Sequence, residues 1–155
     1  MIYTSPKSIQ LFKTNNDERK LNETLSFSNP KPLSMLSFLI SLITKENDII
    51  LDFFSGSGIT AQAIIKKNSE DMLKRKYILI QLPENLDKTL NSVTGKAKTN
   101  IESMIRYLDS RGKKHKLSEI GKERIRIVGD KIVEENKDKE GIENLDIGFK
   151  VIKIK

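Results

Sequence analysis

The sequence contains no cysteine. Disulfides, thiolate metal sites and a covalent cysteine nucleophile are therefore excluded, and the lack of cysteine fits a cytoplasmic location. No run of about 18 apolar residues occurs, so we expect no membrane-spanning helix and no membrane partner. The opening stretch MIYTSPKSIQLFK lacks the charged start and the apolar centre of a secretory signal, so none is predicted.

Charged residues are unevenly distributed in a chain that otherwise has the composition of one soluble globular domain. The formal net charge of +7 suggests an anionic partner. Between Arg106 and Arg126 eight lysines and arginines stand against three acids, and between Asp130 and Asp146 seven acids stand against three lysines. This pattern is compatible with contact to nucleic-acid phosphates and also with a plain solvated helical surface. The candidate phosphate contacts are Arg111, Lys113, Lys114 and Lys116.

The first two thirds of the chain predict an α/β fold. Residues 1–30 lack periodicity and are interpreted as an irregular N-terminal arm with a short helix around Ser8 to Phe12. In residues 31–95 we expect elements in the order helix, strand, helix, strand, and both strands are continuous apolar runs. Such runs are typical of a parallel sheet that is covered on both faces, so we expect part of a doubly wound, mostly parallel, Rossmann-like sheet. The predicted elements are a helix after Pro32 to about Ile43, a strand at Asp48–Phe53, a helix at Ile59–Lys67 and a strand at Lys76–Leu82.

Residues 96–155 are predicted to form a helical extension that is first basic, then acidic, and ends in a strand. Lys98 to Ser110 has a helical pattern, and the loop RGKKHK follows it. Ser118 is a candidate cap for a longer helix that runs to about Glu135. The stretch ENKDKEGIEN predicts a polar turn region, and DIGFKVIKIK predicts a terminal strand.

The stretch ILDFFSGSGIT, residues 50–60, carries the candidate ligand site. An apolar strand ends at Asp52, and Gly56 and Gly58 then permit positive φ and close approach of another group. A strand that leads through such a turn into a helix leaves backbone N–H groups free for anions or small polar ligands at the carboxyl edge of the sheet. The spacing Gly56-x-Gly58-x-x-Ala61 also loosely matches a dinucleotide fingerprint. Against a nicotinamide cofactor, Asp52-Phe53-Phe54-Ser55 lies between the apolar run and the first glycine, and Gln81 stands where an acid is expected.

The run Asp-Phe-Phe-Ser-Gly-Ser-Gly-x-Thr resembles the cofactor motif of amino-group DNA methyltransferases that use S-adenosylmethionine. NPKPLSMLSFLI resembles the Lys-Pro motif that lies directly upstream in the subgroup with circularly permuted motifs. KRKYILIQLPENL and the tail from LSEIGKERIRIVGDKIVEE onward are similar to the modification subunits of type III restriction systems. The resemblance covers most of the chain from about Phe27.

The resemblance implies roles for individual residues. Asp52 would anchor the turn or accept a hydrogen bond from the ammonium group of the cofactor, and Thr60 would cap the helix or contact the carboxylate. Gln81 stands where many family members have an acid for the ribose. Lys31 and Pro32 would close the pocket from the other side. The residues that would hold the methionyl part are Phe53, Phe54, Gly56, Ser57 and Gly58. A tight turn without a ligand, with Phe53 and Phe54 in the core, is the structural alternative.

The family's catalytic motif, Asp/Asn-Pro-Pro-aromatic, is absent, since the sequence contains no Pro-Pro. In the permuted subgroup that motif and the target-recognition region lie upstream of the cofactor motif. The resemblance therefore implies the carboxyl-terminal portion of a DNA adenine-N6 methyltransferase, inactive alone. Its expected partners are DNA, an amino-terminal piece that carries the catalytic motif, and a restriction subunit. A split or decayed gene would give such a chain, and Met1 favours a natural start over a truncation.

Two other functions stay open from the sequence. One is a nicotinamide-binding module, and the other is a non-catalytic subunit whose basic segment binds DNA or protein. His115 has no acid or metal partner nearby in the sequence and is given no role. Tyr77, Tyr107 and Phe149 are expected to be packing residues.

Overall fold

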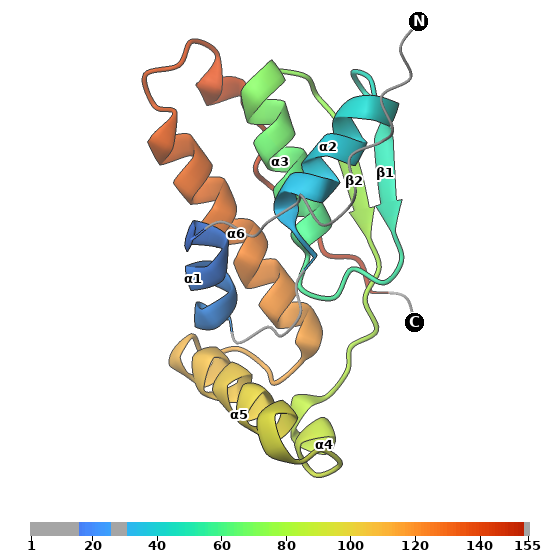
Figure 1. Cartoon of the computed structure of the whole chain (residues 1–155), viewed down its shortest axis with the longest axis vertical. Helices are drawn as coiled ribbons and strands as arrows, with labels where there is room; N and C mark the ends of the chain where they lie inside the picture. Colours follow the sequence, from blue (N-terminus) through green and yellow to red (C-terminus); the bar gives the residue numbers. More distant parts are fainter. Residues whose placement is uncertain (1–15, 26–30, 154–155) are drawn as a thin grey trace, which may run out of the picture.

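The structure, a computed structural model, describes residues 16–25 and 31–153. Two strands lie at one end of the molecule with helices α2 and α3, and α4 and α5 lie at the other end, with the long helix α6 reaching between them (Figure 1). The mixed α/β class is confirmed, although the sheet has only two strands in the described part of the chain. The elements are α1 (Asn16–Thr24), α2 (Leu33–Ile43), β1 (Ile49–Asp52), α3 (Ile59–Asp71), β2 (Lys76–Leu79), α4 (Leu86–Leu90), α5 (Gly95–Ser110), α6 (Leu117–Glu135) and a 3₁₀ turn (Ile142–Asn144).

The predicted strand–helix–strand unit is present. β1 and β2 pair in parallel, from Ile49 opposite Lys76 to Asp52 opposite Leu79, and α3 connects them. Both strands are shorter than the sequence predicted, because the chain bends after Asp52 and leaves the ladder after Leu79. The parallel arrangement places the carboxyl ends of both strands at one edge of the sheet, where the glycine turn begins.

One face of the sheet is covered and the other is open. Ile50 and Tyr77 pack into a core with α2 and α3, whereas large apolar residues of the opposite face are exposed. The expectation of a sheet covered on both faces is therefore wrong for the described residues, since their helices reach only one face. The exposed face consists of Ile49, Leu51, Ile78, Ile80 and Leu82, and we call it the open sheet face.

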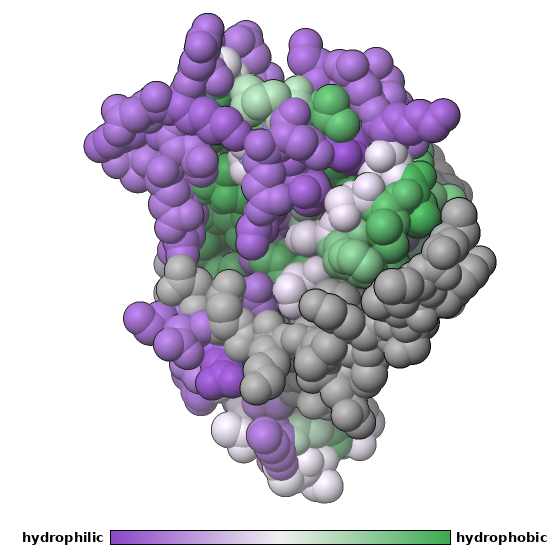
Figure 2. Space-filling model, turned by 45° about the horizontal axis from the view of Figure 1, so that its top comes forward, coloured by the Kyte–Doolittle hydropathy of each residue, from purple (hydrophilic) through white to green (hydrophobic). Residues whose placement is uncertain are grey.

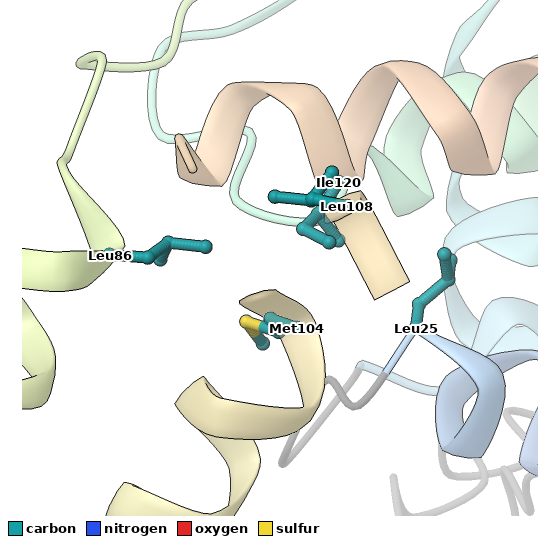
Figure 3. Packing of buried hydrophobic residues seen from close by; sticks show 5 residues of the cluster. All are labelled: Leu25, Leu86, Met104, Leu108 and Ile120. Atoms are coloured by element: carbon teal, nitrogen blue, oxygen red, sulfur yellow. The ribbon is translucent and has the colours of Figure 1, made fainter. Parts of the chain in front are cut away.

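A second core joins the helices at the other end of the molecule. Side chains from the end of α1, from α4, from α5 and from α6 converge there (Figure 3). This core ties the predicted C-terminal extension to the rest of the chain through a helix of the N-terminal arm. Its buried members are Leu25, Leu86, Met104, Leu108 and Ile120.

Two sequence predictions are corrected, and a third falls on residues that the structure does not describe. The N-terminal arm is not wholly irregular, because α1 forms within it and packs Leu21 and Leu25 against the second core. The helix expected around Ser8 to Phe12 lies outside the described residues. Ser118 does not cap α6: it is the second residue of the helix, and Lys116 occupies the cap position.

No terminal strand forms in the described residues 146–153. Ile147 and Phe149 instead pack against the buried face of α6, and Gly148 O accepts a hydrogen bond from the Tyr77 hydroxyl at 3.4 Å. The segment has the alternating pattern of a strand, but side-chain packing replaces ladder pairing here.

Candidate cofactor site

Asp52 joins the end of β1 to the start of α3. Its Oδ1 accepts a hydrogen bond from the Phe54 N–H at 3.1 Å, and its Oδ2 accepts one from the Thr60 hydroxyl at 2.6 Å. A carboxylate at the start of a helix is also favoured by the helix dipole. Asp52 and Thr60 therefore hold the two ends of the turn together, and we call residues 53–58 the glycine turn.

Gln81 holds the glycine turn from the side of β2. Its Oε1 accepts from the Gly56 N–H at 2.8 Å, and its Nε2 donates to Leu82 O at 3.2 Å. Beside it, the Ser55 N–H donates to Ile80 O at 3.2 Å. The residue that the sequence analysis placed at the ribose thus contacts the turn directly.

The two glycines of the turn adopt the conformation that the sequence predicted. Gly56 has φ 50° and Gly58 has φ 76°, and both values lie in the left-handed region that side chains disfavour. Gly58 also lies against Gly121 of α6: a Cβ built on Gly58 would be 3.2 Å from Gly121 O. The sequence analysis missed this contact, and a glycine within a long helical pattern was the available signal.

The backbone N–H groups of residues 54–60, in the glycine turn and at the start of α3, fall into two sets. Those of Phe54, Ser55, Gly56 and Gly58 donate to acceptors within the chain, so the expectation that the turn leaves its amides free is wrong for these four. Within the described residues, the N–H groups of Ser57, Ile59 and Thr60 have no hydrogen-bond partner. They include the first donors of α3, which a helix cannot satisfy internally.

The glycine turn has a covered side and an open side. Ser57 is 3% exposed beneath α6, while Gly56 and Thr60 are half-buried. Phe53 and Phe54 are 61% and 80% exposed, and their ring centroids lie 5.1 Å apart. These aromatic side chains are therefore not core residues in the described chain.

The Lys-Pro pair lies at the same edge of the sheet. Pro32 is the N-cap of α2, and in Figure 1 α2 begins at the level where the strands end. Leu33 and Ile59, the first residues of α2 and α3, belong to one buried cluster. Lys31 is exposed. The fold thus brings the start of α2 and the start of α3 together.

Two hollows in the described surface have volumes of about 370 and 310 Å³. The first lies between α6 and residues 147–151, and the second lies around the end of α3 and the start of β2. Neither is lined by a residue of the glycine turn. Contact at the turn would therefore be made along its half-exposed rim.

The basic segment is only partly a solvated surface. Arg111, Lys113 and Lys114 are exposed, Lys116 is half-buried, and the Arg111 guanidinium lies 5.6 Å from the centre of the Tyr107 ring. Arg124 is 1% exposed and cannot contact phosphate.

Arg124 instead links three helices. Its Nη1 donates to Gln62 Oε1 of α3 at 2.9 Å, and its Nη2 donates to Asn22 Oδ1 of α1 at 2.6 Å. Burial lowers the pKa of Arg124 to about 10, and the charge of Glu18 opposes that shift. Arg124 therefore belongs neither to a phosphate-binding surface nor to a solvated helical surface.

His115 was given no role from the sequence, yet it lies between two carboxylates. Its Nδ1 is 2.8 Å from Asp87 Oδ1, and its Nε2 is 2.8 Å from Asp109 Oδ1. Hydrogen bonds to Asp109 and Asp87 raise the pKa of His115. Both ring nitrogens can donate only in the imidazolium form, so this geometry favours the charged ring. Asp87 comes from α4, far away in the sequence, and local spacing could not reveal it.

Two further classes of site were sought in the described residues. No helix among them is long and apolar enough to cross a membrane. They also contain no group of three or more His, Cys, Asp or Glu side chains that could hold a metal ion.

Comparison with known protein families shows which family contains this βαβ unit and its turn. A family described as DNA methylase matches residues 5–92, which is more than half of the chain. The chain therefore belongs to this family of DNA methylases, and the resemblance stated from the motifs is confirmed.

Curated relatives refine the comparison. The chain is 37% identical over 93 residues to the type III restriction-modification enzyme EcoPI Mod subunit of Escherichia phage P1. It is 34% identical over 124 residues to the StyLTI Mod subunit of Salmonella typhimurium, and 36% identical over 77 residues to the type II methyltransferase M.KpnI of Klebsiella pneumoniae. The matches cover 56%, 80% and 50% of this chain but only 14%, 16% and 18% of these relatives, so the chain spans a small part of their length.

Proposed function

We propose that this chain is the S-adenosylmethionine-binding portion of a DNA adenine-N6 methyltransferase of the type III modification class. The observation that carries the proposal is the set of unpartnered N–H groups of Ser57, Ile59 and Thr60 at the start of α3. They lie within and directly after the glycine turn, which is part of the segment that matches the DNA methylase family. A helix start of this kind favours a carboxylate, and the methionyl end of the cofactor supplies one.

The residues present fit this cofactor in part. The unpartnered N–H groups would bind its carboxylate, that of Thr60 from the half-buried rim and those of Ser57 and Ile59, which are 3% and 8% exposed, from the covered side. Asp52 with Thr60 would hold them in place. The exposed rings of Phe53 and Phe54 offer an apolar surface beside the turn. The Gln81 side chain, already bonded to Gly56, lies where a ribose hydroxyl would be bound. Bound S-adenosylmethionine would supply an electrophilic methyl group for in-line transfer to an exocyclic amine.

The isolated chain is proposed to be inactive. Its sequence has no Pro-Pro motif to hold a flipped base against an aromatic ring. The catalytic motif would come from a separate amino-terminal piece that pairs with the free edge of β1 and covers the open sheet face. The Mod subunits among its relatives belong to restriction-modification enzymes by name, and a restriction subunit is proposed as a further partner.

Binding of S-adenosylhomocysteine tests the cofactor proposal without requiring activity. When the pure chain is titrated in a calorimeter, it should bind S-adenosylhomocysteine saturably and should not bind NAD. Gly56→Asp should abolish binding, because a side chain and a negative charge would then stand at the turn. Aspartate is chosen because it tolerates the positive φ of this position better than most residues do. Gly95→Asp is the matched control, since Gly95 has φ 57° and open space around it.

The outcomes separate the candidate functions. Loss of binding in Gly56→Asp with retention in Gly95→Asp supports the methyl-donor site. Tight binding of NAD with no response to S-adenosylhomocysteine would instead favour the nicotinamide module. If neither compound binds and the circular dichroism spectrum is that of a folded protein, the cofactor proposal is wrong for the isolated chain.

A further inference from the structure

Helix α6 forms the wall behind the glycine turn. Gly121 approaches the turn so closely that a Cβ built on it would lie 3.2 Å from Gly56 O, 3.6 Å from the Ser57 carbonyl carbon and 3.7 Å from Gly58 N. In return, a Cβ on Gly58 would lie 3.2 Å from Gly121 O. The two backbones are thus in direct contact at the peptide groups that follow the first glycine.

A second link fixes α6 to α3 one turn further along each helix. The Gln62 N–H donates to Gly58 O at 3.3 Å, and the Gln62 side chain accepts from the buried Arg124 guanidinium at 2.9 Å. The position of α6 relative to the start of α3 is therefore set by a backbone contact at Gly121 and by a hydrogen bond at Arg124. Interiors this tightly packed transmit small displacements instead of absorbing them.

From these contacts we infer that Gly121 is a positioning residue for the cofactor turn. Its lack of a side chain lets α6 press against residues 56–58 and so fixes the direction of the unpartnered N–H groups that follow. The inference rests on the proposed function, because it concerns the donors assigned to the cofactor carboxylate. It makes the C-terminal extension a part of the cofactor site, although α6 contributes no ligand-contacting side chain there.

A pair of glycine variants in one helix tests the inference. Gly121→Ala places a methyl group against the turn, and Gly129→Ala places one 2.9 Å from the Ile147 Cβ, away from the turn. Alanine has a higher helix propensity than glycine at both positions, so a difference between the two variants does not come from helix propensity. Gly121→Ala should weaken S-adenosylhomocysteine binding about fivefold to tenfold, the loss expected for one hydrogen bond made poorly, while Gly129→Ala should change it less than about twofold.

Unchanged affinity in Gly121→Ala, or an equal loss in both variants, would overturn the inference. A second measurement uses the unmodified chain, in case Gly121→Ala does not fold. Addition of S-adenosylhomocysteine should shift the amide NMR signals of Ser57 and Gly121 but not that of Gly129, and an unmoved Gly121 signal counts against it. If the unmodified chain binds no S-adenosylhomocysteine, the proposed function fails. In that case the inference is tested by the amide signals of Ser57 and Gly58. Gly121→Ala should shift these signals, and Gly129→Ala should leave them in place.

Discussion

At the scale of single residues, His115 has the environment most sensitive to pH. Hydrogen bonds to Asp109 and Asp87 raise its pKa in the folded protein. Because the pKa of His115 is higher in the folded than in the unfolded protein, protonated His115 raises the free energy of unfolding. This contribution is fully present below the unfolded pKa of about 6.5 and is lost as the pH rises through the folded pKa. Both carboxylates are more than half exposed, so solvent screening limits the effect to about 1 kcal/mol or less.

The expected result is a decrease in melting temperature between pH 6 and pH 9 that His115→Asn removes. His115 is the single histidine of the sequence, so no other imidazole contributes to this dependence. Differential scanning fluorimetry of both proteins in matched ionic strength measures it. Parallel pH curves for the two proteins would show that the contacts of His115 do not stabilise the fold. Lowering the salt concentration should enlarge the difference, since the pairs are exposed.

At the scale of elements, the basic loop of residues 111–116 is held at its far end by the segment before α4. Leu86 N–H donates to His115 O at 2.9 Å, and Leu117 N–H donates to Glu84 O at 3.1 Å. Asn85 and Lys116 form an antiparallel bridge beside them. The loop therefore presents its lysines from a fixed backbone, which suits contact with a regular array of phosphates.

If this loop binds duplex DNA, changing Lys113, Lys114 and Lys116 to alanine should weaken binding at low salt. The slope of log affinity against log salt should fall by up to about 2.7, since each phosphate contact contributes roughly 0.9. Fluorescence anisotropy with a labelled duplex measures both quantities. The control changes Lys45, Lys74 and Lys150, which are also exposed and carry the same total charge. Equal losses in the two triple variants would mean that net charge alone determines binding.

The elements that the sequence predicted well are those specified by local pattern. The apolar spacing of α2 after Pro32, the apolar runs of β1 and β2, and the glycine turn all lie within short windows. Positive φ at Gly56 and Gly58 follows from the same local chemistry. Asp52 at the end of β1 and Thr60 in the first turn of α3 lie in this window too, and their predicted roles as site residues come from the resemblance of the motif.

The features that the sequence missed depend on contacts between distant residues. Helix α1 is stabilised by packing Leu21 and Leu25 on helices that come much later in the chain. One hydrogen bond joins Asp87 to His115, and a backbone contact joins Gly58 to Gly121. The predicted terminal strand has strand periodicity, yet tertiary packing against α6 overrides that propensity.

At the scale of the whole molecule, two surfaces of the described residues each carry several exposed large apolar side chains. One is the open sheet face, and the other lies on α2, over whose region Figure 2 shows a green, hydrophobic patch. On α2 the exposed residues are Phe38, Leu39, Leu42 and Ile43. Contiguous apolar surface beside an unpaired strand is typical of an interface and promotes association when it is left open.

The chain alone is therefore expected to self-associate as its concentration rises, and the open sheet face should drive this. Leu51→Thr with Ile78→Thr should weaken association, because these neighbouring side chains are 55% and 50% exposed and threonine retains strand propensity. Sedimentation velocity over a concentration series measures the change, and the melting temperature should stay nearly constant.

Val151→Thr with Ile152→Thr is the control, since both residues are at least as exposed and lie outside the sheet. A chain that stays monomeric throughout the series, or a control that acts as strongly as the sheet variant, would mean that the open face is not an interface. Weakened association in the sheet variant alone would locate the surface that the amino-terminal piece is proposed to cover.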